Sequence, residues 1–120
     1  MKLLALTCAL LWATVLISLP AAGEEPKAPQ LKCDVGPANK TYGKTQWLVY
    51  SCDDSRTLVI VTAPGNPAMP FYFMFSPHEN EYQLSGEGMG KKDTTDAAFN
   101  ELRGLSERDI LALIEQTKPK

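Results

Sequence analysis

Residues 46–63 read QWLVYSCDDSRTLVIVTA, and they give the clearest secondary-structure pattern in the chain. Two runs rich in β-branched and aromatic residues, at 46–52 and 57–63, flank the turn-forming sequence Asp53-Asp54-Ser55-Arg56. Such a pattern is typical of a β-hairpin. The sequence therefore predicts an antiparallel pair of strands here.

Two more strands are predicted after this hairpin. Residues 64–70, PGNPAMP, contain three prolines and predict a stiff loop, because proline cannot donate to a strand ladder. Residues 71–76 (FYFMFS) and 81–85 (EYQLS) predict a third and a fourth strand, joined by a turn. Upstream, residues 32–44 contain Gly36-Pro37 and Gly43, so we predict a loop there.

Two helices are expected after a glycine-rich connection. Asp93, Thr94 or Thr95 can cap the first helix, and Ser106, with Asp109 three residues later, can cap the second. The expected buried stripes are Ala98, Phe99, Leu102 and Leu105 in the first helix, and Ile110, Leu111, Leu113 and Ile114 in the second. We therefore predict an α+β fold, in which a four-stranded antiparallel meander precedes two C-terminal helices packed on one face.

The first 23 residues have the pattern of a secretory signal. Lys2 is followed by an uncharged apolar run, and Pro20 and small residues precede Glu24. We predict that residues 1–23 are removed and that the protein is periplasmic or secreted. A retained N-terminal anchor is the alternative, because the apolar run is about long enough to cross a bilayer.

The remainder has the size of one small, mildly acidic domain. Its predicted parts are a flexible leader and disulfide-pinned loop at 24–44, an α+β domain at 45–117 and a frayed tail at 118–120. Loss of residues 1–23 removes one basic residue and no acidic residue, so the net charge falls from −2 to −3. This charge argues against nucleic acid as a partner. We also expect no cofactor, and no membrane partner once the signal is gone.

Two cysteines remain after the signal. Cys33 and Cys52 form an even pair in a protein predicted to be exported, which indicates a disulfide. Closing a loop of roughly 20 residues stabilises a fold by about 3 kcal/mol. A metal site is the alternative, but His78 is the only histidine and lies far from both cysteines in the sequence.

The predicted strands are apolar on both sides. Because strand side chains alternate between faces, Phe71, Phe73 and Phe75 share one side, and Tyr72 and Met74 share the other. In the hairpin, Trp47 and Val49 likewise oppose Leu48 and Tyr50, and Leu58 and Ile60 oppose Val59 and Val61. An antiparallel sheet with one wet face should instead alternate apolar and polar residues. We therefore expect the second face to be covered by the Cys33-pinned segment, a second copy of the chain or a protein partner.

A glycine-rich stretch with two lysines, at residues 86–92, is a second candidate for binding. It lies between a predicted strand and a helix start, where free N–H groups attract anions, although neither the P-loop nor the dinucleotide motif is complete. The candidate binding residues are Ser85, Gly86, Gly88, Gly90, Lys91, Lys92, Tyr72 and Met74. We expect a non-enzymatic binding or protein-interaction domain.

An enzyme is the rival hypothesis. A small hydrolase would use His78 with Asp53 or Glu79, but the sequence shows no nucleophile motif to complete such a set. The triplet Asn39-Lys40-Thr41 is an acceptor for N-glycosylation if the source is eukaryotic.

Residues 49–54, VYSCDD, followed by the strand LVIV at 58–61, resemble the opening of the periplasmic C-type lysozyme inhibitors. That resemblance implies a small β-barrel whose later Ser-Gly loop enters the lysozyme cleft, and Ser85-Gly86 would correspond to this loop. The chain departs from the family's pattern at three points. Its partner cysteine lies upstream, its Ser-Gly lacks the following Ala-Arg-Tyr, and two helices follow.

Overall fold

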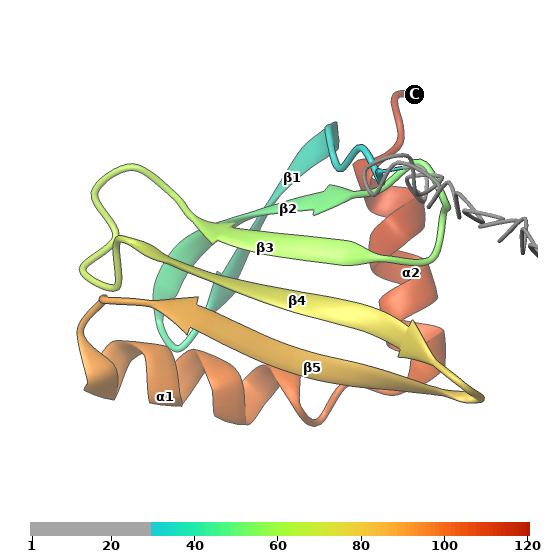
Figure 1. Cartoon of the computed structure of the whole chain (residues 1–120). Coiled ribbons are helices and arrows are strands. Elements are labelled where there is room, and N and C mark those ends of the chain that lie inside the picture. Colours follow the sequence, from blue (N-terminus) through green and yellow to red (C-terminus); the bar gives the residue numbers. More distant parts are fainter. Residues whose placement is uncertain (1–29) are drawn as a thin grey trace, which may run out of the picture.

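The computed structural model describes residues 30–120, and the predicted signal at 1–23 lies outside them. Five strands come first along the described chain, and two helices follow (Figure 1). The strands are β1 (Val35–Tyr42), β2 (Thr45–Ser51), β3 (Leu58–Thr62), β4 (Phe71–His78) and β5 (Glu81–Gly88), and the helices are α1 (Lys92–Leu102) and α2 (Glu107–Thr117).

The strands form one antiparallel sheet in the order β1-β2-β3-β4-β5. Each strand pairs with the next one along the chain, which is a meander. The predicted α+β class, the meander and the two C-terminal helices are therefore confirmed. The predicted number of four strands was wrong, since the described residues form five.

The additional strand is β1, in the region predicted to be a loop. The sheet register shifts between Val35 and Ala38, so a bulge absorbs the Gly36-Pro37 pair, and the proline lies on an edge strand where it is tolerated. Gly43 and Lys44 then have φ values of 59° and 65°, as a tight two-residue hairpin turn requires. The glycines and the proline thus shape a strand instead of interrupting it.

Strand β5 also runs further than predicted, through Gly86 to Gly88. These glycines make room for the aromatic rings of the neighbouring strand β4. A Cβ at Gly86 would lie 2.9 Å from the ring of Phe73, and Gly88 has a φ of 143° with its backbone against Phe71. The predicted glycine-rich loop is therefore shortened to residues 89–91, directly before α1.

The hydrophobic core lies between one face of the sheet and the two helices. In Figure 1, α2 crosses behind the strands and α1 runs along the β5 side. The sheet contributes Trp47, Val49, Leu58, Ile60, Phe73 and Phe75, and the helices contribute Ala98, Leu102, Ile110, Leu113 and Ile114, all of them buried. We call this side of the sheet the inner face.

The two helices start differently. The cap predicted at Asp93, Thr94 or Thr95 was wrong, because α1 begins at Lys92 and its N-cap, Lys91, makes no side-chain cap hydrogen bond. Thr95 instead lies inside the helix, buried, and its hydroxyl donates to the Lys92 carbonyl. At α2, Ser106 and Asp109 form the predicted capping box, which is confirmed. Leu111 was predicted to be buried, but it is exposed on α2.

The predicted disulfide between Cys33 and Cys52 is confirmed. It joins the segment before β1 to the residue after β2, and the Asp53 N–H donates to the Lys32 carbonyl beside it. The Cys33-pinned segment continues into β1, which extends the sheet sideways by pairing with β2. It is therefore an edge of the sheet and not a cover over the second face.

Candidate interaction surface

The second face of the sheet, which we call the outer face, carries two rows of side chains that cross the strands. In the first row, paired residues run Asn39, Leu48, Val61, Tyr72 and Glu87 from β1 to β5. The second row runs Tyr50, Val59, Met74 and Ser85 from β2 to β5. Each row therefore has three apolar residues on the central strands β2, β3 and β4 and a polar residue on β5, and the first row also has a polar residue on β1.

No described segment lies over these rows. The six apolar side chains, Leu48, Tyr50, Val59, Val61, Tyr72 and Met74, are all half-buried, whereas their neighbours on the inner face, such as Ile60 and Phe73, are almost completely buried. Figure 1 views the sheet from the side that neither helix covers. Within residues 30–120, the outer face is thus shielded only by contacts between its own side chains.

An apolar pocket of about 650 Å³ adjoins the outer face at the end of the first row. Val61 and Tyr72 form part of its wall, together with Met69 from the proline-rich loop and Met89 from the β5–α1 connection. Met69 is 49% exposed and Met89 is 90% exposed. All three methionines of the described chain, including Met74, therefore lie on the outer face or at this pocket, and methionine side chains adapt readily to a contacting surface.

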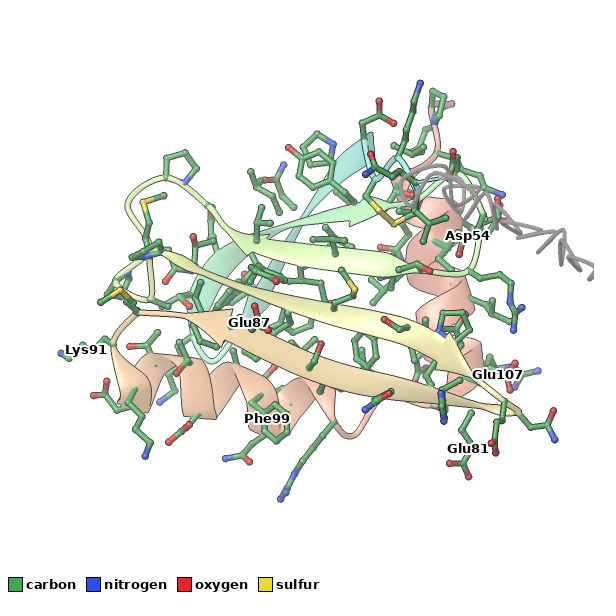
Figure 2. All side chains as sticks on the ribbon, viewed as in Figure 1. Asp54, Glu81, Glu87, Lys91, Phe99 and Glu107 are labelled. Carbon is green, nitrogen blue, oxygen red and sulfur yellow. A yellow bond between two sulfur atoms is a disulfide. The ribbon has the colours of Figure 1, made fainter. Side chains whose placement is uncertain are left out.

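Glu87 is the charged side chain at the edge of the first row, and Figure 2 labels it in front of the sheet. The Tyr72 hydroxyl donates a hydrogen bond of 3.0 Å to its Oε2 atom. This hydrogen bond and the nearby negative charge raise the pKa of Tyr72. Tyr72 thus stays neutral around pH 7, and one Glu87 oxygen, Oε1, is left without a hydrogen bond from the described residues.

The structure brings together only some of the predicted binding residues. Tyr72, Met74 and Ser85 lie on the outer face, with Met74 directly opposite Ser85. Gly86 pairs with Phe73 on the inner face, Gly88 lies against Phe71, and Gly90 approaches the Ala68 backbone.

Lys91 and Lys92 are exposed at the start of α1, and Figure 2 shows Lys91 at the left end of the molecule in this view. The glycines thus serve close packing, and anion binding by Lys91 and Lys92 stays a prediction.

His78 is exposed in the hairpin between β4 and β5, where it pairs with Glu81. No side-chain hydrogen bond in the described part of the chain joins it to Asp53 or Glu79. A polar hollow of about 330 Å³ lies nearby, lined by Arg56, Glu79, Asn80, Glu81, Tyr82 and Glu107, without His78. Within residues 30–120, no three His, Cys, Asp or Glu side chains gather as a metal site.

The sequence indicated the apolar outer face but not its edges. Asn39, Glu87, Met69 and Met89 were not predicted as site residues, because Asn39 and Met69 fell in predicted loops and Glu87 and Met89 in the glycine-rich connection. The sequence signal that could have pointed to Met69 and Met89 is the set of methionines. All of them except Met1 lie in the described residues. Once the strands are paired, the other three gather on one side.

The lysozyme-inhibitor resemblance stays a prediction. Ser85 and Gly86, which would correspond to the inhibitory loop, lie in the middle of β5. Within residues 30–120, β1 and β5 are the two edge strands of the sheet, and they do not pair to close a barrel. None of the helices in the described residues is long and apolar enough to cross a membrane.

Comparison of the chain with protein-family models, curated proteins and solved structures found no match.

Proposed function

We propose that this protein is a non-enzymatic, extracytoplasmic protein-interaction domain that binds its partner on the outer face. The observation that carries the proposal is the pair of cross-strand rows, whose six apolar side chains have no cover from residues 30–120. The largest contiguous apolar patch on a monomeric protein typically measures a few hundred Å² and is often an interaction site.

The energetics favour a partner that fits the face well. Covering about 400 Å² of apolar surface, at about 25 cal/mol per Å², stabilises a complex by roughly 10 kcal/mol. Association itself costs about 4–15 kcal/mol in lost rotational and translational freedom. The two terms are similar in size, so shape complementarity and the polar contacts at the edges decide whether the complex forms.

Three further observations support the non-enzymatic hypothesis and the extracytoplasmic location. The buried hydroxyl of Ser51 is hydrogen-bonded to Thr117, so it has no histidine or carboxylate as a base among the described residues. His78 is exposed and lies outside the polar hollow. The Cys33–Cys52 disulfide agrees with the predicted signal, because disulfides persist in periplasmic and secreted proteins.

Site-specific photo-cross-linking tests the proposal. A benzophenone amino acid replaces Met74, in the second row, in the full chain produced by cells that export it. The matched control carries the same group at Leu111, an exposed apolar residue on α2. We expect a defined cross-linked species from position 74 and none from position 111. No adduct from position 74, or equal adducts from both positions, would contradict the proposal.

A further inference from the structure

We infer that the partner on the outer face is a second copy of the same chain, related by a two-fold axis that lies between the two outer faces, directly over β3 and parallel to it. This inference rests on the proposed function, because it names the occupant of the same surface. β3 is the middle strand of the sheet, so the axis places β2 over the partner's β4 and β1 over the partner's β5. Two copies of one apolar sheet face then pack as an aligned sandwich.

The first row is complementary to itself about this axis. Val61, on the middle strand, meets the partner's Val61. Leu48 faces the partner's Tyr72, which is an aliphatic side chain against an aromatic ring. At the edges, Asn39 faces the partner's Glu87. The Asn39 amide can donate to Glu87 Oε1, because the Tyr72 hydroxyl occupies only Oε2.

The second row behaves in the same way. Val59 lies on the axis and meets the partner's Val59, while Tyr50 faces the partner's Met74. A methionine sulfur near an aromatic ring is a favourable contact. The β2, β3 and β4 residues of both rows therefore form matched pairs about β3, as a two-fold interface requires, since each contact must occur twice. Ser85 has no counterpart, because no β1 residue pairs with Tyr50.

The charges also fit a second copy. The paired residues of both rows include one charged side chain, Glu87, which lies on the edge strand β5. Two such faces meet without like charges at the centre, and the axis brings each Glu87 to the partner's uncharged Asn39. The polar edges and apolar centre match the arrangement of protein interfaces in general.

The size of the face predicts a dimer that dissociates on dilution. Five strands about 4.8 Å apart and about seven residues long make a face roughly 20 Å on a side. Two such faces bury about 800 Å² in total, which is below the roughly 1,000 Å² of a stable interface and in the range of weak, transient complexes. We therefore expect monomer and dimer to exchange, with the dimer prevailing at high protein concentration.

Sedimentation equilibrium of the purified chain, produced without N-glycosylation at Asn39, tests the inference over a wide range of protein concentrations. The mass should rise from one chain to two. Val61→Lys places two lysines together on the axis, so this variant should stay monomeric. Leu111→Lys, an equivalent change on α2, should dimerise like the unmodified protein. Circular dichroism confirms that each variant is folded.

A charge-exchange pair tests the position of the axis. Asn39→Asp brings a carboxylate against the partner's Glu87 and should raise the dissociation constant of the dimer about tenfold or more. Adding Glu87→Lys to Asn39→Asp creates an opposite-charge pair at the same place and should restore dimerisation. Both residues lie at the edges of the sheet, and Asn39 and Glu87 are exposed in the single chain, so neither change threatens the fold.

The outcomes separate this inference from the proposed function. A protein that stays monomeric at every concentration overturns the inference, as does a dimer that neither Val61→Lys nor Asn39→Asp weakens. If the Met74 cross-link then yields an adduct with a different protein, the proposed function stands with that partner. If it yields no adduct, both fail. An Asn39→Asp effect that Glu87→Lys does not reverse overturns the position of the axis.

Discussion

At the scale of single residues, a few polar side chains in the interior form hydrogen bonds with specific partners. Ser51 and Thr117 are separated by 66 positions, yet their hydroxyls lie 2.6 Å apart in the core. Asn66 similarly ties the proline-rich loop to β2, because its side-chain amide donates to the Gln46 carbonyl. Such buried pairs stabilise the fold only while both partners are present.

The Ser51–Thr117 pair predicts unequal effects of two substitutions. The Thr117 hydroxyl donates to the Ile114 carbonyl, so Ser51 must be the donor to Thr117. Thr117→Val leaves the buried Ser51 hydroxyl unpaired and should reduce the free energy of unfolding by about 1–3 kcal/mol. Ser51→Ala should reduce it by about 1 kcal/mol, since Thr117 keeps its other partner. In urea denaturation, the double variant should lose less than the sum of the two, and strict additivity would contradict the pairing.

Tyr42 predicts how the protein responds to alkali. Burial, and to a lesser extent the Glu101 carboxylate, raises the pKa of Tyr42 from 10.0 to about 12. The folded state therefore keeps a proton that the unfolded chain has lost, so the contribution of Tyr42 to stability is complete below pH 10 and falls as the pH rises to about 12. Urea denaturation across this pH range should show that the free energy of unfolding falls less steeply with pH in Tyr42→Phe than in the unmodified protein. An identical loss in the variant would contradict the assignment.

At the scale of elements, the two helices differ in what defines their start. The Ser106 side chain accepts from the Asp109 N–H, and the Asp109 carboxylate accepts from the Ser106 N–H. These hydrogen bonds lower the pKa of Asp109. α1 has no such cap. Its start follows from the short connection after β5 and from the burial of Thr95 against the core.

Removing the cap therefore affects one helix only. Ser106→Ala should reduce the free energy of unfolding by about 1 kcal/mol. The matched change at the start of α1, Lys91→Ala, should have little effect, because that side chain forms no cap hydrogen bond. Because the carboxyl pKa of Asp109 lies below its usual value of 3.8 in the fold, part of the stability should also be lost as the pH falls below that value. Thermal unfolding of the two variants, and of the unmodified protein at decreasing pH, checks these expectations. Equal losses of stability in Ser106→Ala and Lys91→Ala would contradict the assignment of the cap to α2.

The elements also show what the sequence can and cannot predict. β2, β3 and β4 were predicted because apolar residues dominate them. β1 (VGPANKTY) was missed, since an edge strand needs little apolar character and its pairing with β2 depends on the turn at Gly43-Lys44. The end of β5 was missed because glycine usually signals a loop, whereas Gly86 and Gly88 accommodate the rings of β4. Close packing between strands is invisible in a single strand's sequence.

At the scale of the whole molecule, residues 30–120 form two layers, helices on a sheet, and none of these residues covers the other side of the sheet. The apolar alternation predicted that this second face needs a cover. The identity of the rows was not predictable, because a register follows from the bulge at Gly36-Pro37 and from the turns, not from any one strand. The candidate surface thus needed the paired sheet before it was complete.

The disulfide contributes to the stability of the whole domain. Replacing both Cys33 and Cys52 by alanine should reduce the free energy of unfolding by about 3 kcal/mol, because the unfolded chain regains the freedom of a loop of roughly 20 residues. A reducing agent should lower the free energy of unfolding of the unmodified protein by a similar amount, measured by urea denaturation. It should leave that of the variant unchanged. Equal sensitivity of both proteins to the reductant would contradict this account.

Methyl NMR of the methionines tests most directly whether the chain leaves its outer face open. With labelled methionine methyl groups, Met69, Met74 and Met89 each report from this side of the molecule. In dilute, monomeric protein, a soluble paramagnetic agent should broaden the Met74 signal, although less than that of Met89, which is 90% exposed. A Met74 signal that stays sharp in the monomer would mean that the chain covers the face itself, which would contradict the central claim.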